Sequence, residues 1–218
     1  MKKLFPIVLC GGVGTRLWPI SRKTLPKQFF NLFGTKCLFQ NTILRIRDKN
    51  IAEPIIVTNE DYKFLVNEKL SEIFIKPKSI LLEPISKNTA PAIIAAAIAL
   101  NISENNDDNN MVVLPSDHYV PNETIFKEMI LNSIESIQDD KIITFGIKTS
   151  RPETGFGYIN TKNKKNNEGF FEVEEFVEKP NLEKALEYHK LDNFYWNSGI
   201  FMFSSKTIIN LAKKHCLD

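Results

Sequence analysis

The chain has 218 residues, of which 43% are hydrophobic and 25% are charged, and this ordinary balance excludes intrinsic disorder for most of it. The net charge of +2 is unevenly distributed, because nine of the 28 basic residues lie in the first 47 residues, which contain no Asp or Glu. A basic segment of this kind implies an anionic partner near the start of the chain.

The first ten residues, MKKLFPIVLC, are basic and then apolar, as in a secretory signal peptide. The run breaks at Gly11 and Gly12 without a small-residue cleavage pattern, so we predict a buried first strand over residues 5–10. No apolar run approaches the roughly 20 residues of a membrane helix. The three cysteines are odd in number and far apart, unlike a zinc site or a secreted disulfide framework. These features predict a cytoplasmic protein without a membrane partner.

Short apolar runs alternate with helical stretches through the first 150 residues. Runs that are apolar on both faces suit the central strands of a parallel sheet covered by helices. Further strands are predicted at 55–58, 80–82, 111–114 and 142–145, and helices at 38–48, 61–73, 92–100 and 125–137. This order predicts an α/β fold built on an open sheet with right-handed crossovers.

The helix predicted at 92–100, AIIAAAIAL, is apolar all round, which indicates a buried helix. Asn88 or Thr89 can cap it, and Pro91 suits its first turn.

The pattern changes after residue 150, where strands are predicted at 158–161, 171–177 and 200–203. No long helix separates the first two, and NKKNN at 163–167 is typical of a polar hairpin tip. We therefore expect residues 1–218 to form one domain with two halves, about 1–150 and about 151–218, the second with a mixed sheet.

A glycine-rich segment, GGVGTRL, directly follows the first strand. Glycines there allow backbone N–H groups to face phosphate oxygens, and Arg16 adds a planar, permanently charged guanidinium that can donate two hydrogen bonds to a phosphate. The segment is neither a dinucleotide fingerprint, because Leu17 replaces the third glycine, nor a P-loop, because no Gly-Lys-Ser/Thr follows. A small phosphorylated ligand is favoured over nucleic acid, because the basic segment lacks a repeated basic-aromatic array. A simple connecting turn is the alternative.

Lys27 and Asp117 are the next candidates for a phosphate site. Lys27 follows Pro26 and can reach a phosphate as a point charge, although an exposed lysine is the alternative. Asp117 follows an apolar run, and ligands of open α/β sheets bind beyond the carboxyl ends of strands. A carboxylate is a hard ligand that suits Mg²⁺ bound to substrate phosphates. The alternative is that Asp117 only caps a turn.

Glu83, Asn88 and Thr89 lie between the third strand and the apolar helix, where they could contact a nucleotide base, or where Asn88 and Thr89 could simply cap the helix. Gly155 and Gly157 allow the backbone to approach a ligand closely, or else they form a hairpin turn.

Together these segments resemble the sugar-1-phosphate nucleotidylyltransferases, and among them the mannose-1-phosphate guanylyltransferases. The resemblance begins with GGVGTRLWPISR and PKQF and continues, in the same order, with EP and NTAPA, PSDH, TGFGYI, FVEKP and WNSG. The ordered set spans almost the whole chain. Phe156 stands where tyrosine is common in that family. The resemblance implies a Rossmann-like open, mixed and mostly parallel sheet with helices on both faces.

The resemblance also implies roles for individual residues. GTP and mannose 1-phosphate would be the substrates and Mg²⁺ the cofactor, with Arg16, Lys27 and Asp117 as catalytic residues and Asp117 as metal ligand. The implied nucleotide-binding residues, in the first half, are Gly11, Gly12, Gly14, Thr15, Arg16, Glu83, Asn88, Thr89 and Ser116. The implied sugar-phosphate-binding residues, in the second half, are Gly155, Gly157, Glu178, Lys179 and Asn197. An exposed ion pair is the alternative for Glu178 and Lys179, and a buried amide satisfied by the backbone is the alternative for Asn197.

One departure from the family pattern concerns length. The family domain continues to a second metal-binding aspartate, whereas this sequence ends at Asp218. We therefore expect a C-terminally truncated chain. A related enzyme with another nucleotide or sugar, and an inactive nucleotide-binding subunit, remain alternatives. The oligomeric state, including a homo-oligomer, stays open.

Overall fold

The computed structural model describes residues 3–12, 21–22, 24–85, 88–138, 140–166 and 169–216. The chain forms two compact units. The first contains the chain up to Ile143 together with the segment from Phe201 onward, and the second is Thr144–Ile200. Strand β8 (Phe194–Ser204) begins in the second unit and ends in the first.

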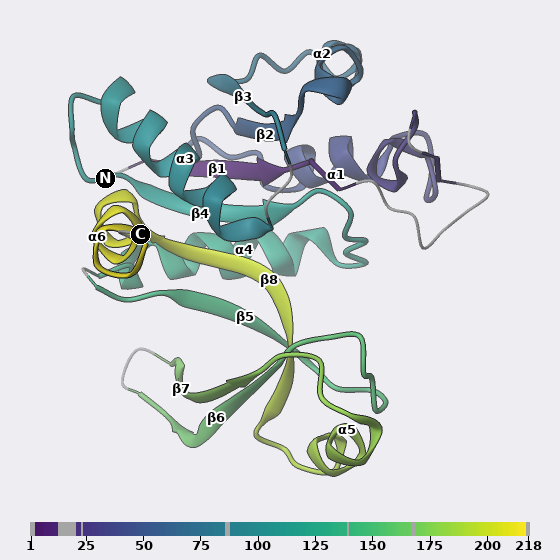
Figure 1. Ribbon diagram of the computed structural model, residues 1–218, viewed down its shortest axis with the longest axis vertical. Helices are drawn as coiled ribbons and strands as arrows, with labels where there is room; N and C mark the ends of the chain where they lie inside the picture. The colour runs from purple at the N-terminus through teal and green to yellow at the C-terminus, as the bar shows by residue number, and fades with distance from the viewer. Residues whose placement is uncertain are drawn as a thin grey trace. The chain divides into compact units, whose positions relative to one another are not determined.

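The first unit is built on a mixed, mostly parallel sheet (Figure 1). Its parallel strands run in the order β3-β2-β1-β4, and the end of β8 pairs antiparallel with β4. The parallel strands are β1 (Leu4–Leu9), β2 (Ile55–Asn59), β3 (Ser79–Glu83) and β4 (Asn110–Pro115). The sheet predicted from the sequence is confirmed, and each of these predicted strands lies within one residue of its observed bounds.

The described residues of this unit form five α-helices. They are α1 (Leu38–Arg45), α2 (Lys63–Glu72), α3 (Thr89–Ser103), α4 (Glu123–Ser133) and α6 (Ser205–His215). Side-chain caps fix the starts of α4 and α6, because an oxygen acceptor satisfies a free N–H of the first turn. The Oδ1 of Asn122 accepts from the N–H of Ile125, and the Oγ of Ser204 accepts from the N–H of Thr207. No helix in the described ranges is long and apolar enough to span a bilayer.

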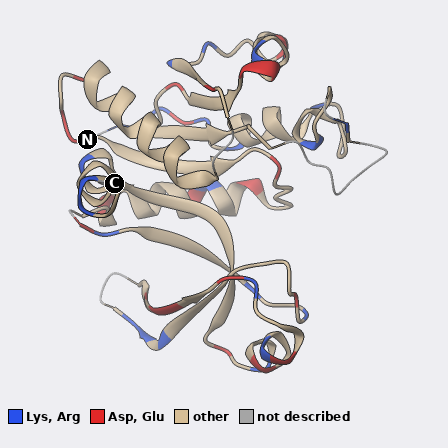
Figure 2. Ribbon diagram, in the orientation of Figure 1, with Lys and Arg blue, Asp and Glu red and all other residues tan. Residues whose placement is uncertain are grey.

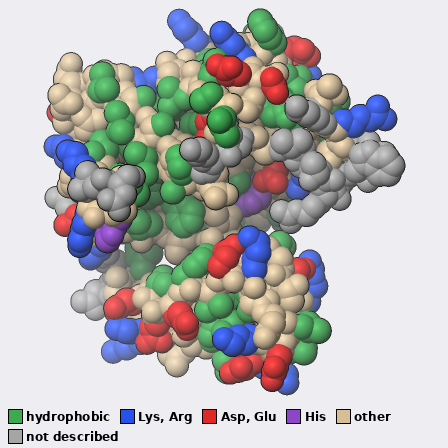
Figure 3. Space-filling view, in the orientation of Figure 1, with side chains coloured by type: hydrophobic (Ala, Val, Ile, Leu, Met, Phe, Trp, Pro, Cys, Tyr) green, Lys and Arg blue, Asp and Glu red, His purple; other side chains and the backbone are tan. Residues whose placement is uncertain are grey.

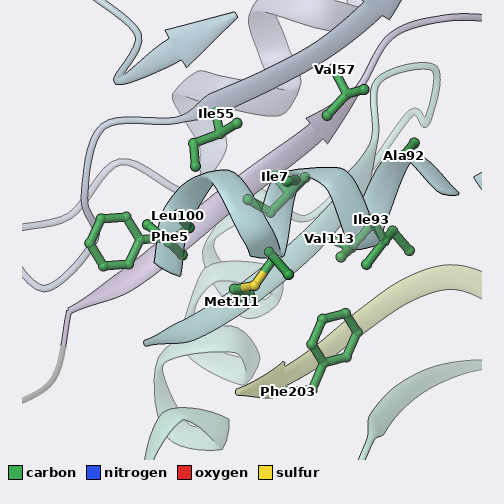
Figure 4. Close-up of a cluster of buried hydrophobic side chains, with 12 residues drawn as sticks. Phe5, Ile7, Ile55, Val57, Ala92, Ile93, Leu100, Met111, Val113 and Phe203 are labelled. Atoms are coloured by element: carbon green, nitrogen blue, oxygen red, sulfur yellow. The ribbon is translucent and has the colours of Figure 1, made fainter. Parts of the chain in front are cut away.

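The alternation of side chains along β1 explains why helices cover both faces of this sheet. Phe5 and Ile7 belong to one core cluster with residues of α3 (Figure 4). Val8 and Cys10 belong to a second cluster with residues of α1 and α2. Fully burying side chains of this size contributes roughly 1.5–3 kcal/mol each. The predicted arrangement of helices on both faces is therefore confirmed.

Helix α3 is not buried all round, and that prediction was wrong. The side facing the sheet is buried at Ala96, Ala97 and Leu100, but Ile98 is 44% exposed and Ile102 is 72% exposed. The helix carries no charged residue, so its ribbon is tan throughout in Figure 2, and hydrophobic side chains, green in Figure 3, gather over it. Composition predicts an apolar helix but cannot show which of its sides is covered.

The start of α3 also differs from the expectation in one respect. Pro91 lies in the first turn, as predicted, and Asn88 is the N-cap residue. The side chain of Asn88 makes no capping hydrogen bond, and its backbone has a φ of 61° and a ψ of −168°, a region that side-chain-bearing residues rarely adopt. The strained Asn88 is therefore not explained by helix capping.

The second unit contains β5 (Ile143–Lys148), β6 (Tyr158–Lys165), β7 (Phe171–Val177) and the start of β8. β6 pairs antiparallel with β7 and with β8, and β5 pairs with β8. Helix α5 (Leu182–His189), which the sequence analysis did not predict, completes the unit. It is eight residues long, and Asn181 caps it by accepting from the N–H of Lys184. Its Ala185 and Tyr188 pack with Tyr158 in a small core.

Candidate active site

The candidate nucleotide site begins where β1 and β4 end. Leu9 is in register with Pro115, and the N–H of Ser116 donates to the carbonyl of Leu9 at 3.1 Å. The segments that start at Gly11 and at Asp117 therefore leave neighbouring parallel strands at the same edge of the sheet. Ligands of open α/β sheets bind at this edge.

The structure brings Lys27 and Asp117 together. The Nζ of Lys27 lies 3.4 Å from Oδ2 of Asp117, and the two side chains are 31% and 45% exposed. An ion pair this long and this open to water contributes little to stability. Both charges are therefore available to a ligand, a cation for phosphate and an anion for a metal.

Lys27 projects from a rigid base. It opens the short 3₁₀-helix η2 (Lys27–Phe29) directly after Pro26, whose φ is −68°. Phe29 is buried, and its ring centroid lies 5.7 Å from that of Phe39. The backbone that carries Lys27 is thus fixed by proline and by the core.

Gln28 is a residue of this site to which the sequence analysis gave no role. Its side chain is buried, and its Nε2 donates to the carbonyl of Gly12 at 2.9 Å and to that of Cys10 at 3.3 Å. It therefore holds the start of the glycine-rich segment against η2. Its position between Lys27 and Phe29 was the only signal in the sequence.

Two further titratable groups lie at this edge and are neutral. Burial raises the pKa of the Cys10 thiol to about 12. Burial also lowers the pKa of His118, whose Nε2 lies 3.9 Å from Oδ1 of Asp117. Neither group is ionised at neutral pH, so they add no charge to that of Lys27 and Asp117.

The candidate base-binding residues lie at the end of a different strand. Glu83 ends β3, is partly buried, and has a pKa raised by that burial. Asn88 and Thr89 are exposed. Among the described residues, no hydrogen bond or ion pair joins these three residues to the Lys27–Asp117 pair. They share the carboxyl edge of the sheet but form a separate group.

Three predicted nucleotide-binding residues lie outside the described residues. These are Gly14, Thr15 and Arg16. Gly11 and Gly12 are described, and an added Cβ at Gly12 would meet no atom of the described residues within 4 Å.

The metal-binding side chains available at this edge suit a metal ion that is held largely by the phosphates of a substrate. The described residues contain no group of three or more His, Cys, Asp or Glu side chains that could hold a metal ion. Mg²⁺ in phosphate-transfer sites is commonly bound by one or two carboxylates together with phosphates and waters. Asp117, half exposed at the carboxyl edge of the sheet, fits that mode and does not fit an all-protein cage.

The second unit brings together most of the predicted sugar-phosphate residues. The N–H of Asn197 donates to the carbonyl of Gly157 at 2.8 Å. An added Cβ at Gly157 would lie 2.8 Å from Cζ of Phe176 and 2.9 Å from Oε2 of Glu178, so any larger residue would displace these two side chains. The Oδ1 of Asn197 accepts from the N–H of Gly199 at 3.2 Å and from Oγ1 of Thr144 at 3.4 Å. The amide orientation is thereby fixed.

Lys179 forms an exposed ion pair with Glu178, which was the alternative to a role in binding the sugar phosphate. Its Nζ lies 2.6 Å from Oε1 of Glu178, with the two side chains 60% and 57% exposed. Lys179 also has a φ of 45°. The pair is weak because water screens it, so a bound anion could take the place of Glu178.

Glu153 organises the glycine turn of this unit, a role that the sequence analysis missed. Its Oε1 accepts from the N–H of Gly155 at 3.1 Å, and its Oε2 accepts from Nη2 of Arg151 at 3.2 Å. Its own N–H donates to the hydroxyl of Tyr158 at 2.9 Å. The N–H of Gly155, followed by Arg151, lowers the pKa of Glu153. The carboxylate of Glu153 is therefore ionised at neutral pH and holds the turn. This contact is lost only when the carboxylate is protonated, as the pH falls through the lowered pKa.

We expect Glu153→Ala to raise roughly tenfold the KM for the sugar phosphate that the family resemblance implies, with a smaller change in kcat, because one charge-assisted contact to the turn is lost. Initial rates at varied sugar phosphate measure both constants. Glu187→Ala, on the exposed side of α5, is the matched control. An unchanged KM in Glu153→Ala would show that the turn does not depend on this carboxylate.

The mixed, mostly parallel sheet with helices on both faces defines an α/β protein with the nucleotide-diphospho-sugar transferase fold. A model of the nucleotidyl transferase family matches residues 5–217. The chain belongs to the nucleotidyl transferase family.

Relatives in sequence point to one branch of that family. The chain is 40% identical over 219 residues to mannose-1-phosphate guanylyltransferase of Escherichia coli K12, covering 99% of this chain and 46% of that protein. It is 42% identical over 214 residues to the xanthan biosynthesis protein XanB of Xanthomonas campestris pv. campestris strain B100, covering 98% of this chain and 45% of that protein. The chain thus spans less than half the length of these curated relatives.

Solved structures agree with the fold. A protein from Thermus thermophilus, described as a mannose-1-phosphate geranyltransferase, superimposes with a TM-score of 0.83 at 31% identity, over 98% of this chain and 61% of that one. A protein from Helicobacter pylori, described as a mannose-6-phosphate isomerase, gives a TM-score of 0.80 at 33% identity, over 98% of this chain and 75% of that one. The predicted fold class is confirmed.

Proposed function

We propose that this chain is the nucleotidyl-transfer part of a mannose-1-phosphate guanylyltransferase. It would transfer GMP from GTP to mannose 1-phosphate and release pyrophosphate. The observation that carries the proposal is the Lys27–Asp117 pair, at 3.4 Å, where the chain leaves the neighbouring parallel strands β1 and β4. The relatives at about 40% identity that bear this name support the choice of nucleotide and sugar.

The reaction is an in-line displacement at phosphorus. A phosphate oxygen of mannose 1-phosphate forms a bond to the α-phosphorus of GTP, and the bond from that phosphorus to the bridging oxygen breaks. Pyrophosphate leaves with the electron pair. Because little covalent chemistry is asked of the protein, positioning and charge neutralisation supply most of the rate.

The chain's own residues divide this work. Lys27 would turn from Asp117 to the triphosphate and neutralise charge that develops on the leaving pyrophosphate. Backbone N–H groups of the glycine-rich segment would bind phosphate oxygens, and Glu83 would contact guanine. In the second unit Asn197 and Glu178 would bind sugar hydroxyls, and Lys179 would bind the sugar phosphate.

Asp117 would hold Mg²⁺ that arrives with the triphosphate, and the ion would supply charge neutralisation between phosphate groups. A cytoplasmic location, and use of the product for polysaccharide synthesis, belong to the same proposal. Relatives named for alginate and xanthan biosynthesis support the latter.

The test is a turnover assay with the purified 218-residue chain. GTP, mannose 1-phosphate and Mg²⁺ should yield GDP-mannose and pyrophosphate in equal amounts, followed by chromatography and by ³¹P nuclear magnetic resonance. UTP, dTTP and glucose 1-phosphate serve as substrate controls, and EDTA should stop the reaction. Binding of GTP without any turnover would contradict the catalytic proposal and favour a nucleotide-binding subunit. A preference for another pair of substrates would replace GTP and mannose 1-phosphate within the same reaction class.

A further inference from the structure

Arg45 carries a buried positive charge that the proposed reaction does not use. It is the last residue of α1, and its side chain is only 4% exposed. Buried arginines are usually paired and fully hydrogen-bonded, because an unpaired buried charge is costly. An incompletely satisfied one therefore needs an explanation.

The contacts of Arg45 reach the segment that carries Asp117. Its Nη2 donates to the backbone carbonyl of His118 at 3.0 Å, across 73 residues of sequence. The carbon of its guanidinium lies 5.9 Å from the ring centroid of Phe126 on α4. The arginine thus joins α1 to the turn that follows β4 and to the helix after that turn.

The remaining contact of Arg45 is poor. Its Nε lies 3.8 Å from Oε1 of Glu123, too far for a hydrogen bond, and has no hydrogen-bond partner among the described residues. Burial lowers the pKa of Arg45, although a guanidinium stays protonated at neutral pH. Well-packed apolar residues can replace buried charges of this kind without loss of stability. Stability alone therefore does not account for Arg45.

We propose that Arg45 is a positioning residue that fixes the turn at His118 and thereby aims the carboxylate of Asp117. The carbonyl that accepts from Arg45 belongs to the residue directly after Asp117, so a shift of this carbonyl rotates the adjoining peptide and moves the carboxylate. The inference rests on the proposed function for the role of Asp117, but the anchoring of the turn stands on the hydrogen bond alone.

The test compares Arg45→Met, Arg45→Lys and the control Arg47→Met in the full 218-residue chain. Methionine keeps the contact with Phe126 but removes the donor, and lysine keeps a charge and one donor. Arg47 is exposed two residues further on, so its replacement removes the same charge from the surface. Circular dichroism and thermal melting establish that each variant is folded.

The first readout is hydrogen exchange of the backbone amides at residues 116–120. Arg45→Met should exchange at least tenfold faster there than the wild type, with Arg45→Lys intermediate and Arg47→Met unchanged. This readout needs neither substrate nor metal. Unchanged exchange in folded Arg45→Met overturns the inference. If Arg45→Met does not fold, Arg45→Lys decides in the same way.

The second readout is the affinity for Mn²⁺ in the presence of GTP, measured by electron paramagnetic resonance, together with kcat and KM. Arg45→Met should bind Mn²⁺ about tenfold more weakly and lose about a hundredfold in kcat, the scale of a misplaced catalytic group, with little change in the KM for GTP. A rise in KM with kcat retained would contradict the positioning role. If the wild type neither binds Mn²⁺ nor turns over, the proposed function fails, and the exchange readout still decides the role of Arg45.

Discussion

Asp117→Asn should abolish most of the divalent-metal dependence of turnover and lower kcat by roughly a hundredfold to a thousandfold, the scale of losing one preorganised electrostatic contact. The substitution keeps the shape of the side chain and removes its charge. The fold should survive, because the exposed pair with Lys27 contributes at most about 1 kcal/mol to stability. Rates measured across a Mg²⁺ titration, with melting curves for both proteins, test this expectation.

The same variant has an opposite effect on binding without metal. Asp117 repels phosphate, so its neutralisation should leave the affinity for GTP in EDTA unchanged or higher. Asp107→Asn, in the exposed loop before the opposite end of β4, removes an equal charge and serves as control. Activity that survives in Asp117→Asn with its metal dependence intact would show that Asp117 only shapes the turn.

The fold was largely predictable because its strongest signals are local. The strands of the first unit are short apolar runs, and alternation along β1 already places Phe5 and Ile7 against one layer and Val8 against the other. Helix α5 was missed because it has only eight residues and follows an inconspicuous Asn181 cap. The exposed side of α3 was missed because composition does not show what covers a helix.

The candidate site was predictable only in part. Lys27 and Asp117 each lie in a recognisable sequence motif, and both were predicted as site residues. Their contact spans 90 residues, so no local pattern predicts it. Gln28 and Arg45 reach backbone groups that are distant in the sequence, so no local pattern contains their contacts. Glu153 reaches Gly155 only two residues away, but it lies just outside the segment that carries the resemblance. Residues that bind substrates leave motifs, whereas residues that hold those motifs in place become visible only in the structure.

Lys27→Met should lower kcat/KM for GTP by roughly a hundredfold to a thousandfold, since it removes a fixed cation from the developing pyrophosphate. The base of the side chain should not move, because Pro26, buried Gln28 and buried Phe29 hold η2 without it. Lys27→Arg, which keeps the charge on a longer side chain, should retain part of the activity. Lys36→Met, exposed in the same acid-free segment, is the control for net charge.

A second measurement separates a role in chemistry from a merely structural ion pair. Lys27 competes with any cation for the Oδ2 of Asp117 at 3.4 Å. Removing it should therefore strengthen Mn²⁺ binding to the nucleotide-free chain by a few-fold while turnover falls, two changes of opposite sign. Calorimetric titration with Mn²⁺ gives the first, and initial rates give the second. Turnover near the wild-type level, or Mn²⁺ affinity that falls together with it, would mean that Lys27 supports the turn at Asp117 rather than the phosphates.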